Sequence, residues 1–204
     1  MKNSILTLLA VAAMVACNKK ESTAVNNSGD STADMSMPAD SPMTLNDSAT
    51  VADPNAATAT LSTQDKTFAD AAARGGMMEV MMGQLASTTS TNATVKALGE
   101  MMAKDHGMAN DELKKWASAT GYTLPTSLNA EQQKMHDDLK AKKGADFDRA
   151  YTDLMVTDHK KDIAEFKKEA SGGSDASLKG FATKTLPTLE HHLMESEKAK
   201  AAVK

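Results

Sequence analysis

Four stretches with helical hydrophobic periodicity dominate the chain after Leu61 and limit what it can fold into. They cover about 63–87, 94–119, 145–170 and 177–201, and a shorter one covers about 130–142. Gly121, Pro125, Gly144 and the turn sequence SGGSD separate them. Helices of about 25 residues are about 37 Å long, and short connections favour antiparallel neighbours. We therefore predict an all-α fold, an antiparallel four-helix bundle with one additional short helix.

The composition agrees with a helical domain. Aromatic residues make up only 3% of the 204 residues, whereas methionine occurs 15 times. Strands favour aromatic and β-branched side chains, so this bias favours helices. The net charge of −4 is mild and no long basic run occurs. We therefore predict no nucleic-acid partner.

The N-terminus has the features of a secretory signal. Lys2 provides a positive charge, and residues 5–16 form an apolar run too short to span a bilayer as a mature helix. The run ends in MVAC, which resembles the bacterial lipoprotein cleavage box, with Met14 where leucine is usual. We predict a signal peptide over 1–16 and lipidation of Cys17, which would anchor the protein in the cell envelope, in the outer membrane facing the periplasm. The alternatives are a plain secretory signal with an incidental cysteine, or an uncleaved anchor.

The segment after the cysteine differs from the rest of the chain. Residues 18–60 are mainly Ser, Thr, Asp, Asn and Ala, without apolar periodicity. Such a segment cannot bury enough apolar surface to offset its conformational entropy. We therefore assign 17–60 to the lipidated cysteine with a disordered tether, and 61–204 to the bundle domain.

Gly75 and Gly76 interrupt the first helical pattern. A glycine inside a helix costs about 1 kcal/mol relative to alanine. We expect the pair to allow another helix to approach closely; a gap for a ligand is the alternative.

Each of the four long helical patterns carries ionisable groups near its midpoint, on or beside its apolar face. In chain order these are Glu79, Asp105 with His106, Asp158 with His159, and His192. An isolated buried charge is costly unless it is paired. Because the groups lie at matched depth in all four helices, we predict that they meet in one polar cluster.

Several stretches of the chain carry a family resemblance. They are AAARGGMMEVMMGQLA, VKALGEMMAKDH, FDRAYTDLMVTDHKKDIAEF and FATKTLPTLEHHLME. With them the chain resembles the bacterial domain-of-unknown-function family 4142, from about Phe68 to the last helix. The resemblance implies a ferritin-like helical bundle in an envelope protein, often described as an outer-membrane or membrane protein. It also implies that the family's recurrent polar positions fall on Glu79, Asp105, His106, Asp158, His159 and His192. No activity follows from it, and the methionines at 77, 78, 81 and 82 depart from the usual pattern.

Histidines and carboxylates in this combination match the ligand sets of several transition metals. We predict one mononuclear site for Zn, Cu or Fe, in which His106, His159 and His192 are ligands. Glu79 would be a fourth ligand or a partner of one of them.

Other side chains are expected around these ligands. Asp105 and Asp158 would orient the imidazoles through hydrogen bonds. Met102 and Met155 each precede a histidine by one helical turn and share its face. A thioether near an imidazole would suit copper, whereas filling of the core is the simpler interpretation.

Two other interpretations stay open. The cluster can be a satisfied hydrogen-bond network that fixes helix register, in a structural or interaction module that binds no metal. A ferritin-like redox enzyme is the third interpretation, but dinuclear iron bundles use Glu-x-x-His motifs, and none occurs in this chain. We predict no catalytic residue, and the sequence identifies no partner protein.

Overall fold

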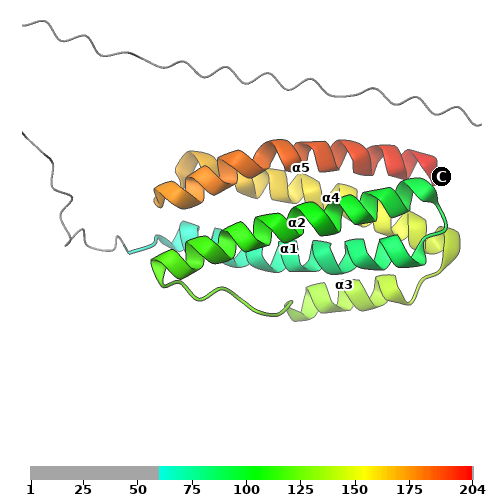
Figure 1. The fold of residues 1–204 in the computed structure, drawn as a ribbon, viewed down its shortest axis with the longest axis horizontal. Coiled ribbons are helices and arrows are strands. Elements are labelled where there is room, and N and C mark those ends of the chain that lie inside the picture. Colours follow the sequence, from blue (N-terminus) through cyan, green and yellow to red (C-terminus); the bar gives the residue numbers. More distant parts are fainter. Residues whose placement is uncertain (1–59, 204) are drawn as a thin grey trace, which may run out of the picture. The chain divides into compact units, whose positions relative to one another are not determined.

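The computed structural model describes residues 60–203, which form five α-helices and no strand (Figure 1). The helices are α1 Thr63–Thr89, α2 Ala93–Thr120, α3 Ala130–Lys140, α4 Gly144–Gly172 and α5 Ala176–Ala202. The predicted all-α fold class, four long helices and a short one, is confirmed. The predicted signal peptide, the lipidated Cys17 and the tether lie outside the described residues. Within 60–203, no helix combines enough length and apolar character to cross a membrane.

The helix ends follow from local side-chain chemistry. Ser62 and Asp65 form a capping box at α1, in which each side chain accepts from the other's backbone N–H. Asn129 and Gln132 form a second capping box at α3. These side chains satisfy backbone N–H groups that have no partner inside the helix. Gly121 ends α2 in the left-handed conformation with φ 69°, which glycine adopts without steric cost.

The helices form two hairpins joined by one long crossover. α1 packs mainly against α2, and α4 packs mainly against α5; the hairpins meet where α2 contacts α5 and α1 contacts α4. Figure 1 shows that α2 ends at one end of the bundle and α4 begins at the other, with α3 in the connection between them. Every neighbouring pair in the ring of four long helices is therefore antiparallel. A bundle with a single long crossover has ferritin-like topology.

The backbones of the two helices of the first hairpin approach each other closely at a pair of glycines. A Cβ on Gly83 would lie 2.6 Å from the Gly99 carbonyl oxygen, and a Cβ on Gly99 would lie 2.6 Å from that of Gly83. Of the two glycines where we expected a close approach, only Gly76 has a near neighbour. A Cβ on Gly75 would meet nothing within 4 Å, whereas one on Gly76 would clash with Oδ1 of the Asn110 side chain on α2.

The apolar core has two halves. The aromatic half-core contains Phe68, Ala69, Ala73, Leu113, Trp116, Ala117, Phe166, Leu178, Phe181, Ala182 and Leu189. The methionine half-core contains Met78, Met82, Ala86, Val95, Leu98, Met102, Leu139, Phe147, Tyr151, Met155 and Ala199. Along α2, α4 and α5, the ionisable residues near the midpoint fall between the members of the two halves, and on α1 Glu79 directly follows Met78 at the edge of the methionine half-core. They form a polar layer across the middle of the bundle.

Candidate metal centre

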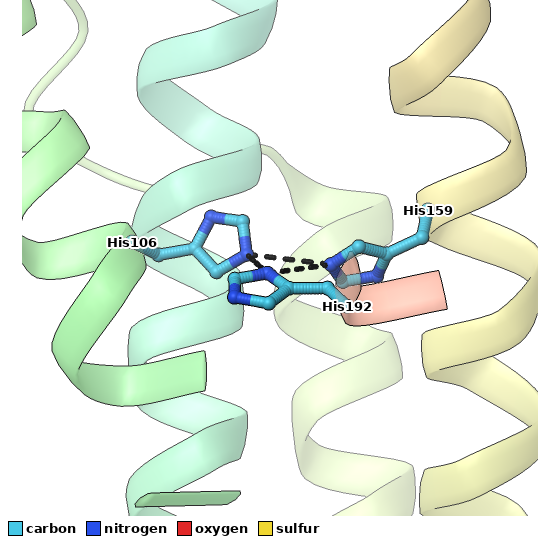
Figure 2. Close-up of side chains that lie close together, drawn as sticks. All are labelled: His106, His159 and His192. Atoms are coloured by element: carbon cyan, nitrogen blue, oxygen red, sulfur yellow. Dashed lines mark hydrogen bonds between the residues drawn. The ribbon is translucent and has the colours of Figure 1, made fainter. Parts of the chain in front are cut away.

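Three histidines from three helices converge in the polar layer (Figure 2). His106 lies on α2, His159 on α4 and His192 on α5, and all three are buried. Their inward-facing nitrogens are Nε2 of His106, Nε2 of His159 and Nδ1 of His192. These nitrogens are 3.4 Å apart for His106 and His159, 3.3 Å for His159 and His192, and 3.2 Å for His192 and His106. An atom at their centre would contact all three rings.

Each imidazole directs its other nitrogen at an oxygen. Glu79 Oε2 lies 2.8 Å from His106 Nδ1, the Met155 carbonyl oxygen 2.9 Å from His159 Nδ1, and Asp105 Oδ2 3.1 Å from His192 Nε2. A carbonyl oxygen only accepts, so His159 carries its proton on Nδ1 and directs the Nε2 lone pair inward. The two carboxylates have the same effect on their rings when they are ionised. Carboxylate and carbonyl partners of this kind orient metal-binding histidines in proteins.

The spacing of the inward nitrogens suits a tetrahedral ion. Zinc–nitrogen bonds of about 2.0–2.1 Å with tetrahedral angles separate two nitrogens by about 3.3–3.4 Å. The three observed separations, 3.2–3.4 Å, agree with this geometry. The fourth ligand of such an ion would then lie to one side of the plane of the three nitrogens.

Burial keeps the imidazoles neutral. Removal of water from the charged form lowers the pKa of His106 and His192 to about 4 and that of His159 to about 3. Asp162 and Asp105 oppose this shift at His106, whereas the two neighbouring rings add to it at His159. Neutral imidazole is the form that binds a metal ion.

Glu79 on α1 closes the cluster from the fourth helix. Its Oε2 pairs with His106, and its Oε1 lies 3.6 Å from His159 Nε2. Oε1 is buried and finds no hydrogen-bond partner in residues 60–203. Burial and the nearby Asp158 carboxylate raise the pKa of Glu79 to about 8, although a hydrogen bond with Asp162 acts in the opposite direction. In this geometry Glu79 orients His106 and still has one oxygen available to a cation.

The two aspartates of the repeated Asp-His pair have different surroundings. Asp105 contacts His192 on a neighbouring helix. Asp158 was expected to orient an imidazole too, but His159 is oriented by the Met155 carbonyl, and Asp158 Oδ2 is buried without a hydrogen-bond partner in the described residues. Burial raises the pKa of Asp158 to about 6. The expected orienting role therefore falls to Asp105 and to a main-chain group.

Asp162 belongs to the cluster and was not predicted. Burial, together with the neighbouring Glu79 and Asp158, raises its pKa well above the usual range. It follows His159 by three residues, in the sequence DHKKD. Residues three apart share a helix face, so this spacing was the available signal.

The methionines next to the cluster contribute packing. Met102 and Met155 are completely buried members of the methionine half-core. Met155 also supplies the carbonyl oxygen that accepts from His159. Both observations agree with the simpler interpretation of these side chains.

The comparisons with known proteins agree with the fold. Residues 50–199 match the family described as Domain of unknown function (DUF4142). The chain belongs to the DUF4142 family. Among solved structures, this DUF4142 chain is similar to the crystal structure of a DUF305 fragment from Deinococcus radiodurans, with 12% identity and a TM-score of 0.61. The likeness covers 70% of this chain and 98% of that one, and it concerns the fold alone. None of the curated proteins matches significantly.

Proposed function

We propose that this DUF4142 chain is a lipid-anchored envelope protein whose bundle binds one transition-metal ion at His106, His159 and His192. One observation carries the metal proposal. Three imidazole nitrogens point at a common centre with separations of 3.2–3.4 Å, and oxygen acceptors hold the opposite nitrogen of each ring. When Glu79 and Asp105 are ionised, no proton lies between the three inward nitrogens. Three facing lone pairs repel each other, and a cation removes that repulsion.

Zn²⁺ fits the site best among the metals considered. It favours four-coordinate tetrahedral sites with nitrogen ligands, and the nitrogen spacing agrees with that geometry. Imidazole nitrogens are also good ligands for copper, so the test must identify the element. Glu79 Oε1 or a water molecule would supply the fourth ligand. The proposal is metal binding or buffering in the envelope, without turnover.

A hydrogen-bond network is the competing function of the same residues. With a pKa of about 8, Glu79 can hold a proton and donate it to His106 Nδ1. His106 Nε2–H would then donate to another ring, and the cluster would be partly satisfied without metal. A divalent cation at the histidines favours the ionised form of Glu79. The metal site and the hydrogen-bond network therefore differ in the protonation state of Glu79.

Envelope anchoring is supported by the sequence. Residues 1–16 have the character of a signal peptide, and Cys17 stands at the position that lipoprotein processing modifies. Globomycin, which blocks the lipoprotein signal peptidase, should cause the uncleaved form to accumulate. Cys17→Ala should release the protein from membranes, whereas unchanged membrane association would contradict lipidation.

The decisive test is elemental analysis of the full chain purified from its native envelope without added metal. We expect close to one metal ion per chain, and its loss in His192→Gln. The matched control is His191→Gln, because His191 is adjacent and exposed. If the unsubstituted chain is folded and holds no metal, and none binds on titration, the network interpretation replaces the metal proposal.

A further inference from the structure

A narrow cavity adjoins the histidine cluster on the side of the aromatic half-core. Its lining includes His106, Glu79, Asp162, Glu165, Gly75 and Gly76. Its volume is about 20 Å³, enough for one water-sized particle. The cavity therefore admits a partly dehydrated ion and excludes metabolites.

The carboxyl groups in this cavity run from the surface to the cluster. The Glu165 side chain is 40% exposed, Asp162 is half-buried, and the Glu79 side chain is 2% exposed. Glu165 and Asp162 lie on α4, three residues apart and so on one face. Asp162 and Glu79 both line the cavity, and Glu79 Oε2 lies 2.8 Å from His106 Nδ1. Carboxylate oxygens that can serve as metal ligands are thus available at each level of the cavity, from the surface to the histidines.

The cavity lining contains no lysine or arginine. Lys161 lies beside the outer carboxylate, with Nζ 3.8 Å from Glu165 Oε1, but its side chain is 73% exposed. Such an exposed pair contributes little and leaves Glu165 available. The groove over Asp105, between α2 and α5, differs because Lys184 lines it and pairs with Glu112.

Two further observations, a buried oxygen of Glu79 and the absence of a side chain at Gly75, independently indicate a passage for a cation. Glu79 Oε1 belongs to a side chain that is 2% exposed, and it has no hydrogen-bond partner in residues 60–203. Gly75 also lines the cavity, and a Cβ there would meet nothing within 4 Å. Helix packing therefore does not account for this glycine, whereas an open passage does.

We infer that this cavity is the entry route by which a divalent transition-metal cation reaches the three histidines, with Glu165, Asp162 and Glu79 as successive oxygen ligands. The inference rests on the proposed metal site and adds the path to it. A passage lined by one sign of charge raises the local concentration of counter-ions and their rate of entry. Residues at its outer end should control rates, and the histidines should control affinity.

The test follows Co²⁺ uptake by the metal-free full chain in a stopped-flow spectrometer, because tetrahedral Co²⁺ absorbs visible light. Release is followed after addition of excess chelator. Gly75→Leu places a side chain in the passage and should slow uptake and release by the same factor, about ten-fold or more, with Kd unchanged. Gly180→Leu is the matched control, since Gly180 is also helical and without neighbours within 4 Å, and it is exposed and not part of the cavity lining.

A second pair of variants tests the charge at the entrance. Glu165→Gln should slow uptake about four-fold at low ionic strength, the effect of one charge on a divalent ion at about 10 Å in water. The difference in uptake rate between Glu165→Gln and the unsubstituted chain should shrink in about 0.5 M salt, because ions screen the charge of Glu165 there. Glu100→Gln, an equal charge change at an exposed position outside the cavity, is the control.

The outcomes separate the route from the site. If the unsubstituted chain binds Co²⁺ and both Gly75→Leu and Glu165→Gln keep its uptake rate, the route is wrong and the metal site stands. If the unsubstituted chain binds neither Co²⁺ nor Zn²⁺, the metal site is wrong and the route falls with it. Circular dichroism shows whether each variant is folded, so that a slow uptake rate is not the result of unfolding.

Discussion

His192 Nε2 lies 3.1 Å from Asp105 Oδ2, in a contact that joins α5 to α2. Because the carboxylate accepts from Nε2–H, the other ring nitrogen, Nδ1, directs its lone pair at His106 and His159. Asp105 therefore sets both the orientation and the tautomer of a buried imidazole from another helix. Loss of Asp105 should therefore be visible in metal binding, although Asp105 itself does not face the centre of the three histidines.

Asp105→Asn should weaken metal binding without unfolding the bundle. The amide can donate to His192 Nε2 and so place the ring proton on Nδ1, where it competes with the metal. Loss of such an outer partner typically costs about 10- to 100-fold in metal affinity. Competition with a chromogenic chelator measures the change.

Asp158→Asn is the matched control for that experiment. It makes the same change in the second Asp-His pair, but the hydrogen bonds found in residues 60–203 join no histidine ring to Asp158. Affinity should stay within about three-fold of the unsubstituted chain, a difference of roughly 0.6 kcal/mol at 25 °C. Equal losses for the two variants would contradict the assignment of the orienting role to Asp105.

The fold was largely predictable because its determinants are local. Apolar periodicity located all five helices to within a few residues. The close backbone contact between Gly83 and Gly99 was missed, because a glycine inside a helix looks the same in the sequence whether or not a neighbouring helix covers it. Only the packed structure distinguishes Gly83, which faces Gly99, from Gly75, which faces open space.

The candidate site was predictable as a set of residues and not as a set of contacts. Depth along four helices was enough to group His106, His159, His192 and Glu79. Neighbouring residues on a helix differ by about 100°, so small helix rotations decide which of two adjacent side chains points inward. His159 is completely buried, whereas its neighbour Asp158 is only half-buried.

Gly83→Ala should destabilise the bundle, whereas Gly75→Ala should stabilise it. A Cβ at Gly83 would lie 2.6 Å from a backbone oxygen and 2.9 Å from the Ala103 nitrogen, so the helices must separate. Overpacking of this kind costs about 1–3 kcal/mol. At Gly75 alanine meets nothing, and the lower entropy of its unfolded chain contributes about 0.4–1 kcal/mol. Urea unfolding of both variants measures the two effects, and a loss of stability in Gly75→Ala would contradict the open space assigned there.

Asp65 should make stability depend on pH in the acid range. Burial opposes its ionisation, but hydrogen bonds from Ser62 and from the Ser174 and Asp175 N–H groups outweigh it and lower the pKa to about 2, from an ordinary value of 3.8. A carboxyl with a lowered folded-state pKa stabilises above its unfolded pKa, and this stabilisation is lost as pH falls from about 4 to about 2.

Asp65→Asn should therefore cost about 2 kcal/mol at neutral pH, the size expected from that shift. The difference from the unsubstituted chain should narrow below about pH 3, because the unsubstituted carboxyl becomes protonated there. Chemical unfolding at pH 7 and near pH 2.5 measures the two values. A cost that is the same at both pH values would mean that packing, and not the charge, accounts for the role of Asp65.

Metal should stabilise the whole bundle, because the histidine layer joins three helices between the two half-cores. A ligand that binds only the folded chain adds about 2.7 kcal/mol at a free concentration of 100 times Kd. For a domain of this size that corresponds to a rise in Tm of roughly 5–10 °C. Zn²⁺ should raise the Tm of the unsubstituted chain and of His191→Gln and leave His192→Gln unchanged, as followed by circular dichroism at 222 nm. An equal rise in His192→Gln would place the stabilising ion elsewhere on the chain, and a rise in none of the three would favour a network that functions without metal.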